Sequence, residues 1–279
     1  MGSLLGGHIT AKRTLPSNQP YKPGTQQLTP GGGGDTLAHM KRLLCVFAHP
    51  DDECLGPGGS IAQCAIDGGE VFITTFTAGE AGSIGISKTL AREELAARRR
   101  LELAGACDAL GVSGFRILGA PDKGVNAVDA AWAVREIVAD IRRLRPQVVM
   151  TFHRGGVSGH PDHIAVHHYL DRAFKETSDG PVRFFGWGMT AEKAAPYERP
   201  NMVPVPEEEV AARVEIGKEA MDRKIAAIRA HETQIDFFNS LQDKFDYRKV
   251  ASPESFALYG SRGTMPDRIL TDLWEGLDV

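Results

Sequence analysis

The sequence contains no apolar run approaching the roughly 18–20 residues that a membrane-spanning helix needs. It also has no surplus of one charge, because 32 lysines and arginines stand against 36 aspartates and glutamates. A nucleic-acid-binding protein typically carries a basic excess, which is missing here. We therefore expect neither a membrane nor a nucleic acid among the partners of this chain.

Cysteine is scarce, and the four that occur are Cys45, Cys54, Cys64 and Cys107, with no C-x-x-C pair among them. This number and spacing are typical of reduced thiols in a cytoplasmic protein rather than of a disulfide framework. Cys54 lies beside a run of acidic residues and could be a nucleophile. No neighbouring residue would activate it, so we favour a structural role.

The first 39 residues lack apolar periodicity and are rich in Gly, Pro, Thr and Gln, which is typical of a linker or a disordered segment. We expect residues 1–39 to be a disordered leader, or one added during cloning, with the native chain starting at Met40. Residues 40–279 are long enough to bury the core of one α/β domain.

Two clusters of His and Asp each follow a short apolar run. Ala48-His49-Pro50-Asp51-Asp52-Glu53 comes directly after residues 43–47, and Gly159-His160-Pro161-Asp162-His163 comes shortly after residues 148–152. A pattern that alternates apolar strands with helical stretches predicts a mostly parallel sheet covered by helices on both faces. In such a sheet the carboxyl ends of strands on either side of the order reversal form one crevice. The two clusters are therefore expected to meet at the ends of the first and fourth strands.

The remaining elements follow from the same periodicities. One helix should bury Leu95, Leu101, Leu103, Ala106 and Leu110 and end at Gly111. A Pro-rich segment spans 196–206, and the last 45 residues show only a weak pattern. The predicted strands span 42–48, 71–76, 115–118, 147–152 and 182–187, and the predicted helices span 58–66, 89–110, 128–144, 160–174 and 207–229.

The residue types in the two clusters predict a metal site. His49, Asp52 and His163 supply imidazole and carboxylate ligands, which suit Zn2+ better than Mg2+ or Ca2+, and three protein ligands leave one position open. Asp51 would remain uncoordinated beside the metal, where it can take a proton from the attacking water. Fe2+ or Co2+ in place of zinc stays possible.

Further residues of the clusters have predicted roles or open alternatives. Protonated His160 would stabilise an oxyanion or protonate a leaving amine, and Asp162 would fix the tautomer of an imidazole. Taken singly, each cluster could also be a strand-end turn with Asp at a helix start. Glu53 could support the site or begin a helix. His167 and His168 should be packing or surface residues, and the role of His153 stays open.

The two clusters resemble the signatures of the LmbE/PIG-L family of zinc-dependent N-acetylglucosaminyl deacetylases. The segment Arg99 to Val112 is similar to the family's R-x-x-E…L-G-V helix, with Glu102 as the acid. The resemblance covers residues 41 to about 275, and its further matches are Thr77-Ala78-Gly79-Glu80 in the loop after the second strand, Lys224, and His231-Glu232-Thr233-Gln234.

The resemblance implies a Rossmann-like sheet and a zinc ion bound by His49, Asp52 and His163. It further implies Asp51 as the general base and His160 as the oxyanion-side histidine, and we add Asp162 to the predicted catalytic residues. Arg99, Glu80 and Ser158 are the expected substrate-binding residues, although Arg99 could instead form a helix-surface salt bridge with Glu102. Mycothiol-pathway members have a Tyr where this chain has Ser158, so a mycothiol-type substrate is uncertain.

The activity that the resemblance implies is hydrolysis of the acetamide of an N-acetylglucosamine-type sugar or sugar conjugate. An amidase that acts on a larger N-acyl or thiol-conjugate substrate is the alternative, and a silent sugar- or nucleotide-binding module is a third possibility. The expected partner is a small amino-sugar substrate. The chain could also form a homo-oligomer.

Overall fold

A computed structural model describes residues 40–84, 90–263 and 267–279. The expected leader at 1–39 lies outside the described residues. Its predicted disorder and the native start at Met40 therefore stay predictions.

The described residues form a single sheet and the helices around it. The strands are β1 (Arg42–Phe47), β2 (Glu70–Thr75), β3 (Gly114–Ile117), β4 (Val148–Phe152), β5 (Arg183–Gly188), β6 (Val210–Val214) and β7 (Glu254–Ser261). The α-helices are α1 (Asp52–Leu55), α2 (Gly58–Ile66), α3 (Arg92–Leu110), α4 (Ala130–Leu144), α5 (Gly156–Gly159), α6 (Pro161–Glu176), α7 (Ala191–Ala194), α8 (Lys218–Ala230), α9 (Ile235–Gln242) and α10 (Tyr247–Val250). Short 3-10 helices are η2 (Val125–Ala127), η3 (Ala195–Tyr197), η4 (Glu207–Glu209) and η5 (Glu232–Gln234).

The strand order in the sheet is β3-β2-β1-β4-β5-β7-β6. The first five strands in this order are parallel, and β7 pairs antiparallel with both β5 and β6. The predicted fold class, a mostly parallel sheet with helices on both faces, is confirmed. The order reverses next to β1, which lies between β2 and β4, so the segments after β1 and β4 open onto one crevice.

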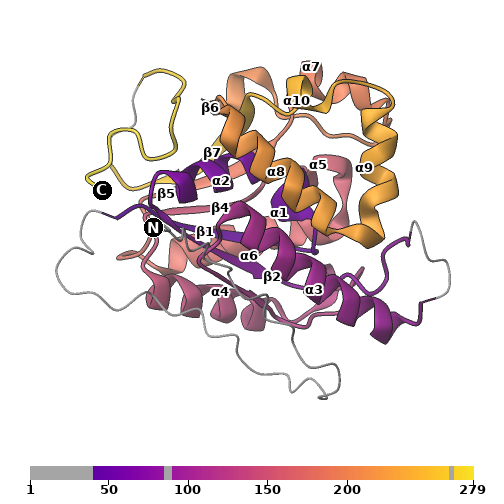
Figure 1. The fold of residues 1–279 in the computed structure, drawn as a ribbon. Coiled ribbons are helices and arrows are strands. Elements are labelled where there is room, and N and C mark those ends of the chain that lie inside the picture. The colour runs from indigo at the N-terminus through magenta and orange to yellow at the C-terminus, as the bar shows by residue number, and fades with distance from the viewer. Residues whose placement is uncertain (1–39, 85–89, 264–266) are drawn as a thin grey trace, which may run out of the picture.

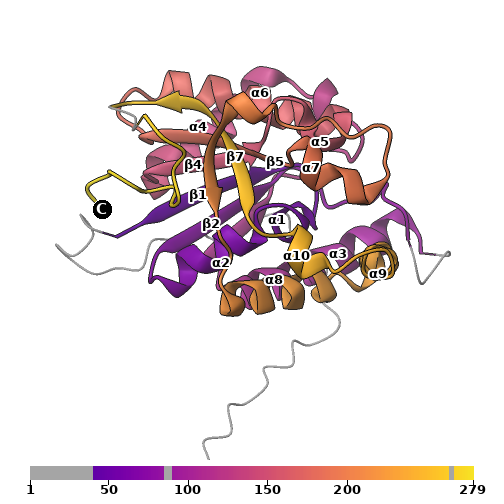
Figure 2. The same cartoon turned by 90° about the horizontal axis from the view of Figure 1, so that it is seen from above.

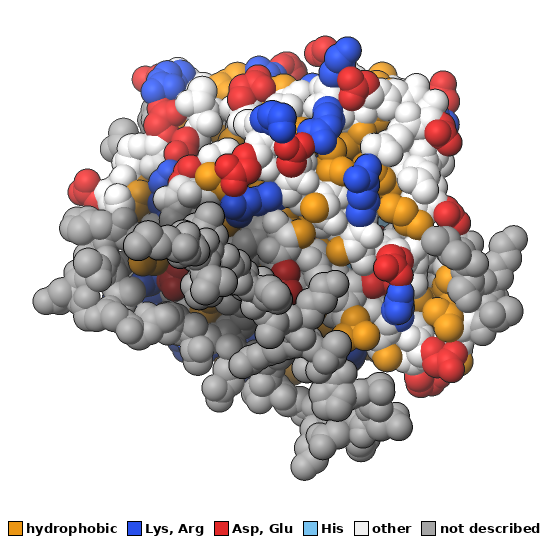
Figure 3. Space-filling view, in the orientation of Figure 1, with side chains coloured by type: hydrophobic (Ala, Val, Ile, Leu, Met, Phe, Trp, Pro, Cys, Tyr) orange, Lys and Arg blue, Asp and Glu red, His pale blue; other side chains and the backbone are white. Residues whose placement is uncertain are grey.

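Helices cover both faces of the sheet, as Figure 2 shows from above. Helices α4 and α6 lie on one face, and α2, α3 and α8 lie on the other (Figures 1 and 2). Every residue of β1 and β4 is buried, as expected for the mostly apolar central strands of a parallel sheet. The visible surface mixes both signs of charge (Figure 3). None of the helices in the described part of the chain has both the length and the apolar character that a bilayer crossing requires.

Two predictions about the helices are wrong. The first concerns residues 207–229, predicted as one helix, where the structure has a 3-10 turn, the edge strand β6 and only then α8. Strand β6 packs against β7 and buries every second residue, namely Val210, Ala212 and Val214. Local periodicity does not reveal this pairing, because β7 lies about forty residues later in the chain. The second concerns Leu101, which is 61% exposed. Helix α3 instead turns two charged residues inward, Arg99 and Glu102.

A buried ion pair attaches the C-terminal part of the chain to the segment that follows β1. Lys224 Nζ of α8 lies 2.7 Å from Glu254 Oε1 of β7 and donates to the carbonyl of Gly56 at 2.7 Å. The Glu254 carboxylate also accepts the backbone N–H groups of Gly59 and Ser60 at the start of α2. Because every charge in this cluster has partners, removal of one leaves a buried ion uncompensated.

We expect Lys224→Met to lower the free energy of unfolding by about 3–5 kcal/mol, because it leaves the buried Glu254 carboxylate without its cationic partner. Urea denaturation followed by circular dichroism measures this loss. Lys218→Met on the same helix removes an exposed ion pair with Asp222 and should leave the unfolding midpoint almost unchanged. Equal midpoints for the two variants would show that the buried pair is not structurally important.

Candidate metal centre

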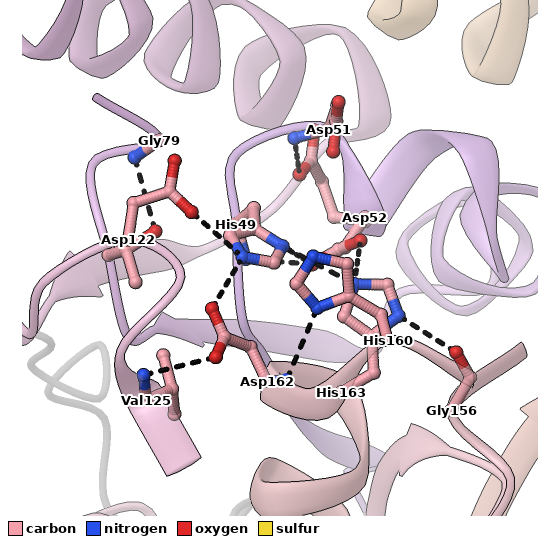
Figure 4. A network of polar contacts seen from close by, with 12 residues as sticks. His49, Asp51, Asp52, Gly79, Asp122, Val125, Gly156, His160, Asp162 and His163 are labelled. Carbon is pink, nitrogen blue, oxygen red and sulfur yellow. Dashed lines mark hydrogen bonds and ion pairs between the residues drawn. The ribbon is translucent and has the colours of Figure 1, made fainter. Parts of the chain in front are cut away.

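The two His/Asp clusters lie side by side at the carboxyl ends of β1 and β4 (Figure 4). His49 and Asp52 belong to the turn that leads from β1 into α1, and His163 is in the first turn of α6. Pro161 at the start of α6 fits a helix N-terminus, where its missing N–H is not needed. The sheet topology therefore brings together residues more than a hundred positions apart.

Three donor atoms of these residues converge. His163 Nε2 lies 3.3 Å from His49 Nδ1 and 3.4 Å from Asp52 Oδ1. His49 Nδ1 lies 3.6 Å from Asp52 Oδ2. A group of three such atoms, close together and from different elements, is the geometry of a protein metal site.

The outer ring nitrogens of His49 and His163 both lie within hydrogen-bond distance of acceptor oxygens. His49 Nε2 lies 3.2 Å from Asp162 Oδ2 and 3.2 Å from Asp122 Oδ1, while His163 Nδ1 lies 3.1 Å from the carbonyl of Gly156. These contacts place an N–H on the outside of each ring, so both inner nitrogens present lone pairs toward the Asp52 carboxylate when the two rings are neutral. Three electron-rich atoms that face one another fit a bound cation.

The pKa values of His49 and His163 also favour a cation at this site. Burial lowers the pKa of His49, but the carboxylates of Asp122, Asp162 and Asp52 outweigh it and raise the pKa to about 12. Burial and the nearby charge of His49 lower the pKa of His163 to about 4, so this ring is neutral. A site that holds a proton on His49 so firmly offers strong stabilisation to a metal cation in its place.

Two other groups of possible ligands have simpler explanations. His160 and Asp162 form one such group only by sharing His49, whose Nε2 already pairs with Asp162. The other group contains Glu53 and His231, whose side chains are joined by a 2.6 Å hydrogen bond that leaves no room for an ion. The set of His49, Asp52 and His163 is therefore the best candidate in the described part of the chain.

Asp51 lies beside this set without belonging to it. Its backbone has φ 110°, a left-handed conformation that non-glycine residues rarely adopt, and this turns it away from Asp52. Burial and the charge of Asp52 raise the pKa of the Asp51 carboxyl to about 7, although His231 and Arg99 oppose them. A carboxylate with a pKa near neutrality is suited to accept and return a proton.

His160 closes another side of the centre. Its ring centroid lies 4.9 Å from that of His49 and 4.8 Å from that of His163. The backbone N–H of Asp162 donates to His160 Nδ1 at 3.2 Å, so the neutral ring carries its proton on Nε2. Burial and the charge of His49 lower the pKa of His160, which disfavours the protonated form that the sequence suggested.

The three predicted substrate residues lie in different surroundings. Glu80 Oε1 accepts the backbone N–H of Asp122 at 2.9 Å and so supports the loop after β3. Arg99 is 2% exposed and donates to the carbonyl of Ser83 at 3.2 Å. Its alternative as a surface partner of Glu102 is wrong, because Arg98 forms that pair. Ser158 lies in the short helix α5 just before His160, where its carbonyl accepts from the Asn201 side chain.

Sequence reasoning missed Asp122, which lies in the loop after β3 and contacts His49 directly. The position of Asp122 shortly after the third strand could have indicated this contact, because the third strand of the parallel sheet also ends at the crevice. Burial alone would raise the pKa of Asp122, but its contact with His49 outweighs burial and lowers the pKa to about 2, so it is a carboxylate.

The remaining histidines and Cys54 are structural in the described region. His167 packs between Phe184 and Tyr259 and His168 is exposed, as predicted. His153 is buried with both ring nitrogens near backbone N–H groups of the next loop. Burial raises the pKa of Cys54 well above its ordinary value, so its thiol is not activated.

Comparison with known proteins identifies relatives that cover most of the chain. A family model described as PIG-L, GlcNAc-PI de-N-acetylase, matches residues 44–174. The 1D-myo-inositol 2-acetamido-2-deoxy-alpha-D-glucopyranoside deacetylase of Acidothermus cellulolyticus is 35% identical, over 86% of this chain and 96% of its own length. The family match contains both His/Asp clusters.

Solved structures share the fold at lower identity. The A40926 pseudoaglycone deacetylase Dbv21 aligns with a TM-score of 0.61 at 24% identity, covering 80% of this chain and 99% of its own. GalB, the 4-carboxy-2-hydroxymuconate hydratase of Pseudomonas putida KT2440, aligns with a TM-score of 0.63 at 19% identity, covering 82% of this chain and 100% of its own. These likenesses establish the fold, and two reaction types share it.

We expect His49→Ala to lower the metal content of the purified protein from about one ion per chain to near zero, because it removes one of three converging donors. Asp162→Ala should keep the donors but weaken metal affinity by about 10–100-fold, since it removes one of the two carboxylates that hold the outer nitrogen of His49. Elemental analysis and chelator competition measure both effects.

The matched control is His168→Ala, which removes an exposed imidazole from the same helix as His163. It should retain full metal content. Full occupancy in His49→Ala would remove His49 from the ligand set.

Proposed function

The chain belongs to the LmbE/PIG-L family, and we propose that it is a zinc-dependent hydrolase that removes the N-acetyl group from an N-acetylglucosamine-type sugar or sugar conjugate. The observation that carries this proposal is the convergence of His49, Asp52 and His163, with the uncoordinated Asp51 beside them. Deacetylation of an amide requires an activated water, a base and a stabilised oxyanion, and this arrangement offers a group for each.

His49, Asp52 and His163 would hold the metal ion. Two imidazoles and one carboxylate suit zinc, and Fe2+ or Co2+ would fit the same donors. When bound, the ion lowers the pKa of water and polarises the acetyl carbonyl. Asp122, Asp162 and the Gly156 carbonyl orient the two imidazoles by accepting their outer N–H groups.

Asp51 is the proposed general base. Its carboxylate takes a proton from the attacking water and returns it to the nitrogen of the leaving amine. The raised pKa, about 7, allows both transfers near neutral pH.

His160 is the proposed oxyanion-side donor. Its Nδ1 is fixed as an acceptor by the Asp162 backbone, so the neutral ring donates through Nε2–H. The neutral donor is consistent with the lowered pKa, because a second positive charge beside the metal would be unfavourable.

Arg99, Glu80 and Ser158 are proposed to bind the sugar or the group attached to it. A buried guanidinium suits hydroxyl and carboxylate groups, because its donors are fixed in one plane. The segment around Ser158 contacts Asn201 and Val203, which supports the proposal that residues 196–206 form part of the outer wall of the substrate pocket. A Ser in place of Tyr leaves more room at this wall for the conjugate.

We also propose a cytoplasmic location. The described cysteines are all buried free thiols, which suits a reducing compartment.

Acetate release from a panel of N-acetylglucosamine derivatives tests the proposed function. We expect release from at least one sugar conjugate, loss of release with a chelator, and recovery on addition of zinc. Longer N-acyl substrates in the same panel test the alternative amidase activity. Activity on those substrates alone would replace the deacetylase proposal, and no hydrolysis of any substrate by the zinc-loaded protein would contradict both.

We expect Asp51→Asn to lower kcat by about 10²–10⁴-fold while metal content is retained, because the amide cannot accept the proton. Asparagine tolerates left-handed backbone conformations, so the turn should be preserved. Steady-state kinetics and elemental analysis on the same sample measure the two effects. Asp108→Asn, an exposed change on α3, is the control, and near-normal turnover by Asp51→Asn would refute the base assignment.

A further inference from the structure

The backbone of Asp51 is held in its unusual conformation by its neighbours. The backbone N–H of Asp51 donates to Glu53 Oε2 at 3.0 Å. Its carbonyl accepts from Leu55 N at 2.9 Å and from the Cys54 thiol at 3.2 Å. A residue at φ 110° needs such contacts to stay there, since the conformation is unfavourable for any side chain beyond glycine.

The Glu53 carboxylate is itself fixed by a residue far along the chain. Its second oxygen, Oε1, lies 2.6 Å from His231 Nε2, and both side chains are buried, with Glu53 0% and His231 1% exposed. One carboxylate oxygen thus holds the Asp51 backbone while the other is tied to His231. A charge-assisted bond of this length in the interior defines the direction of the carboxylate closely.

His231 is fixed in turn by the packing of α8 and η5 against α3. It directly follows α8 and precedes η5. Thr233 of η5 donates to the buried Glu102 carboxylate of α3 through its backbone N–H at 2.9 Å and its hydroxyl at 2.7 Å. Hydrogen bonds at both ends of the backbone segment 231–233 therefore connect Glu102 of α3 to Glu53 and, through it, to Asp51.

We propose that Glu53 and His231 act as a positioning pair that sets the direction of the Asp51 carboxylate for proton transfer. This inference rests on the proposed function, because it assigns Asp51 as the base. Glu53 Oε1 and Oε2 contact His231 and the Asp51 backbone, whereas the converging donors belong to His49, Asp52 and His163. The pair therefore acts on proton transfer and leaves metal binding and substrate binding unchanged.

The test uses the full chain and three variants: Glu53→Ala, His231→Leu and the double variant. A displacement of about 1 Å in a reacting group costs about 10²-fold in rate, so each single variant should lower kcat by about that factor. KM and metal content should stay at wild-type values. The double variant should lose no more than either single variant, because the two residues act as one unit.

The conservative variants distinguish positioning from general support. Glu53→Gln keeps an oxygen acceptor for the Asp51 N–H, and His231→Gln keeps an N–H donor for Glu53, so each should recover kcat to within about fivefold of wild type. Asp140→Asn weakens another buried ion pair, with Arg116 on the far side of the sheet, and controls for loss of stability alone. It should leave kcat unchanged.

Folding of the variants does not limit the test. The double variant removes both buried charges together, which protein interiors tolerate far better than removal of one partner. A folded double variant with kcat within threefold of wild type, or a loss that appears in KM or metal content instead of kcat, would overturn the proposal.

If the proposed function is wrong, the experiment gives a result that differs from failure of the positioning pair. Wild-type protein would then release no acetate at all, and a crystal structure of the double variant would still report the conformation of Asp51. Departure of Asp51 from positive φ in that structure supports the positioning pair, and an unchanged φ overturns it.

Discussion

Two inner ring nitrogens and one carboxylate that converge on one point are the constraint on which the candidate site depends. The inner nitrogens of His49 and His163 and the Asp52 carboxylate lie within about hydrogen-bond range, and the outer nitrogens are tied to other acceptors. Such an arrangement is unfavourable unless a positive charge occupies its centre. A proton on His49 supplies that charge in the metal-free protein, and a divalent cation can supply more of it. The sheet topology holds these atoms together, because the segments after β1 and β4 open onto one crevice.

Three consecutive acids next to this centre have three different roles. Asp52 faces the two imidazoles, which lower its pKa despite burial. Asp51 is turned away by its left-handed backbone, and its pKa is raised. Glu53 is buried against His231 and holds the Asp51 backbone. The proposed ligand, the proposed base and the residue that holds the backbone of that base are therefore adjacent in sequence but differ in their contacts.

The fold alone does not determine the reaction. A hydratase and a deacetylase align with this chain at similar TM-scores, so the chemistry must come from the residues in the crevice. Part of the support for those residues lies outside the segment 44–174 that the family model matches. Lys224, His231 and Glu254 come from that later region and reach back to the segment after β1.

The local pattern of the sequence was enough to predict the central strands, the helices between them and the proximity of the two His/Asp clusters. Continuous apolar runs that end at His and Asp leave few alternatives in a parallel sheet. It could not reveal β6 and β7, whose pairing joins residues far apart in the chain, nor Asp122, which has no motif of its own. Only the tertiary structure decided which ring nitrogen faces inward and how Asp51, Asp52 and Glu53 diverge. Those properties depend on hydrogen bonds and burial contributed by remote elements, which neighbouring residues in the sequence do not specify.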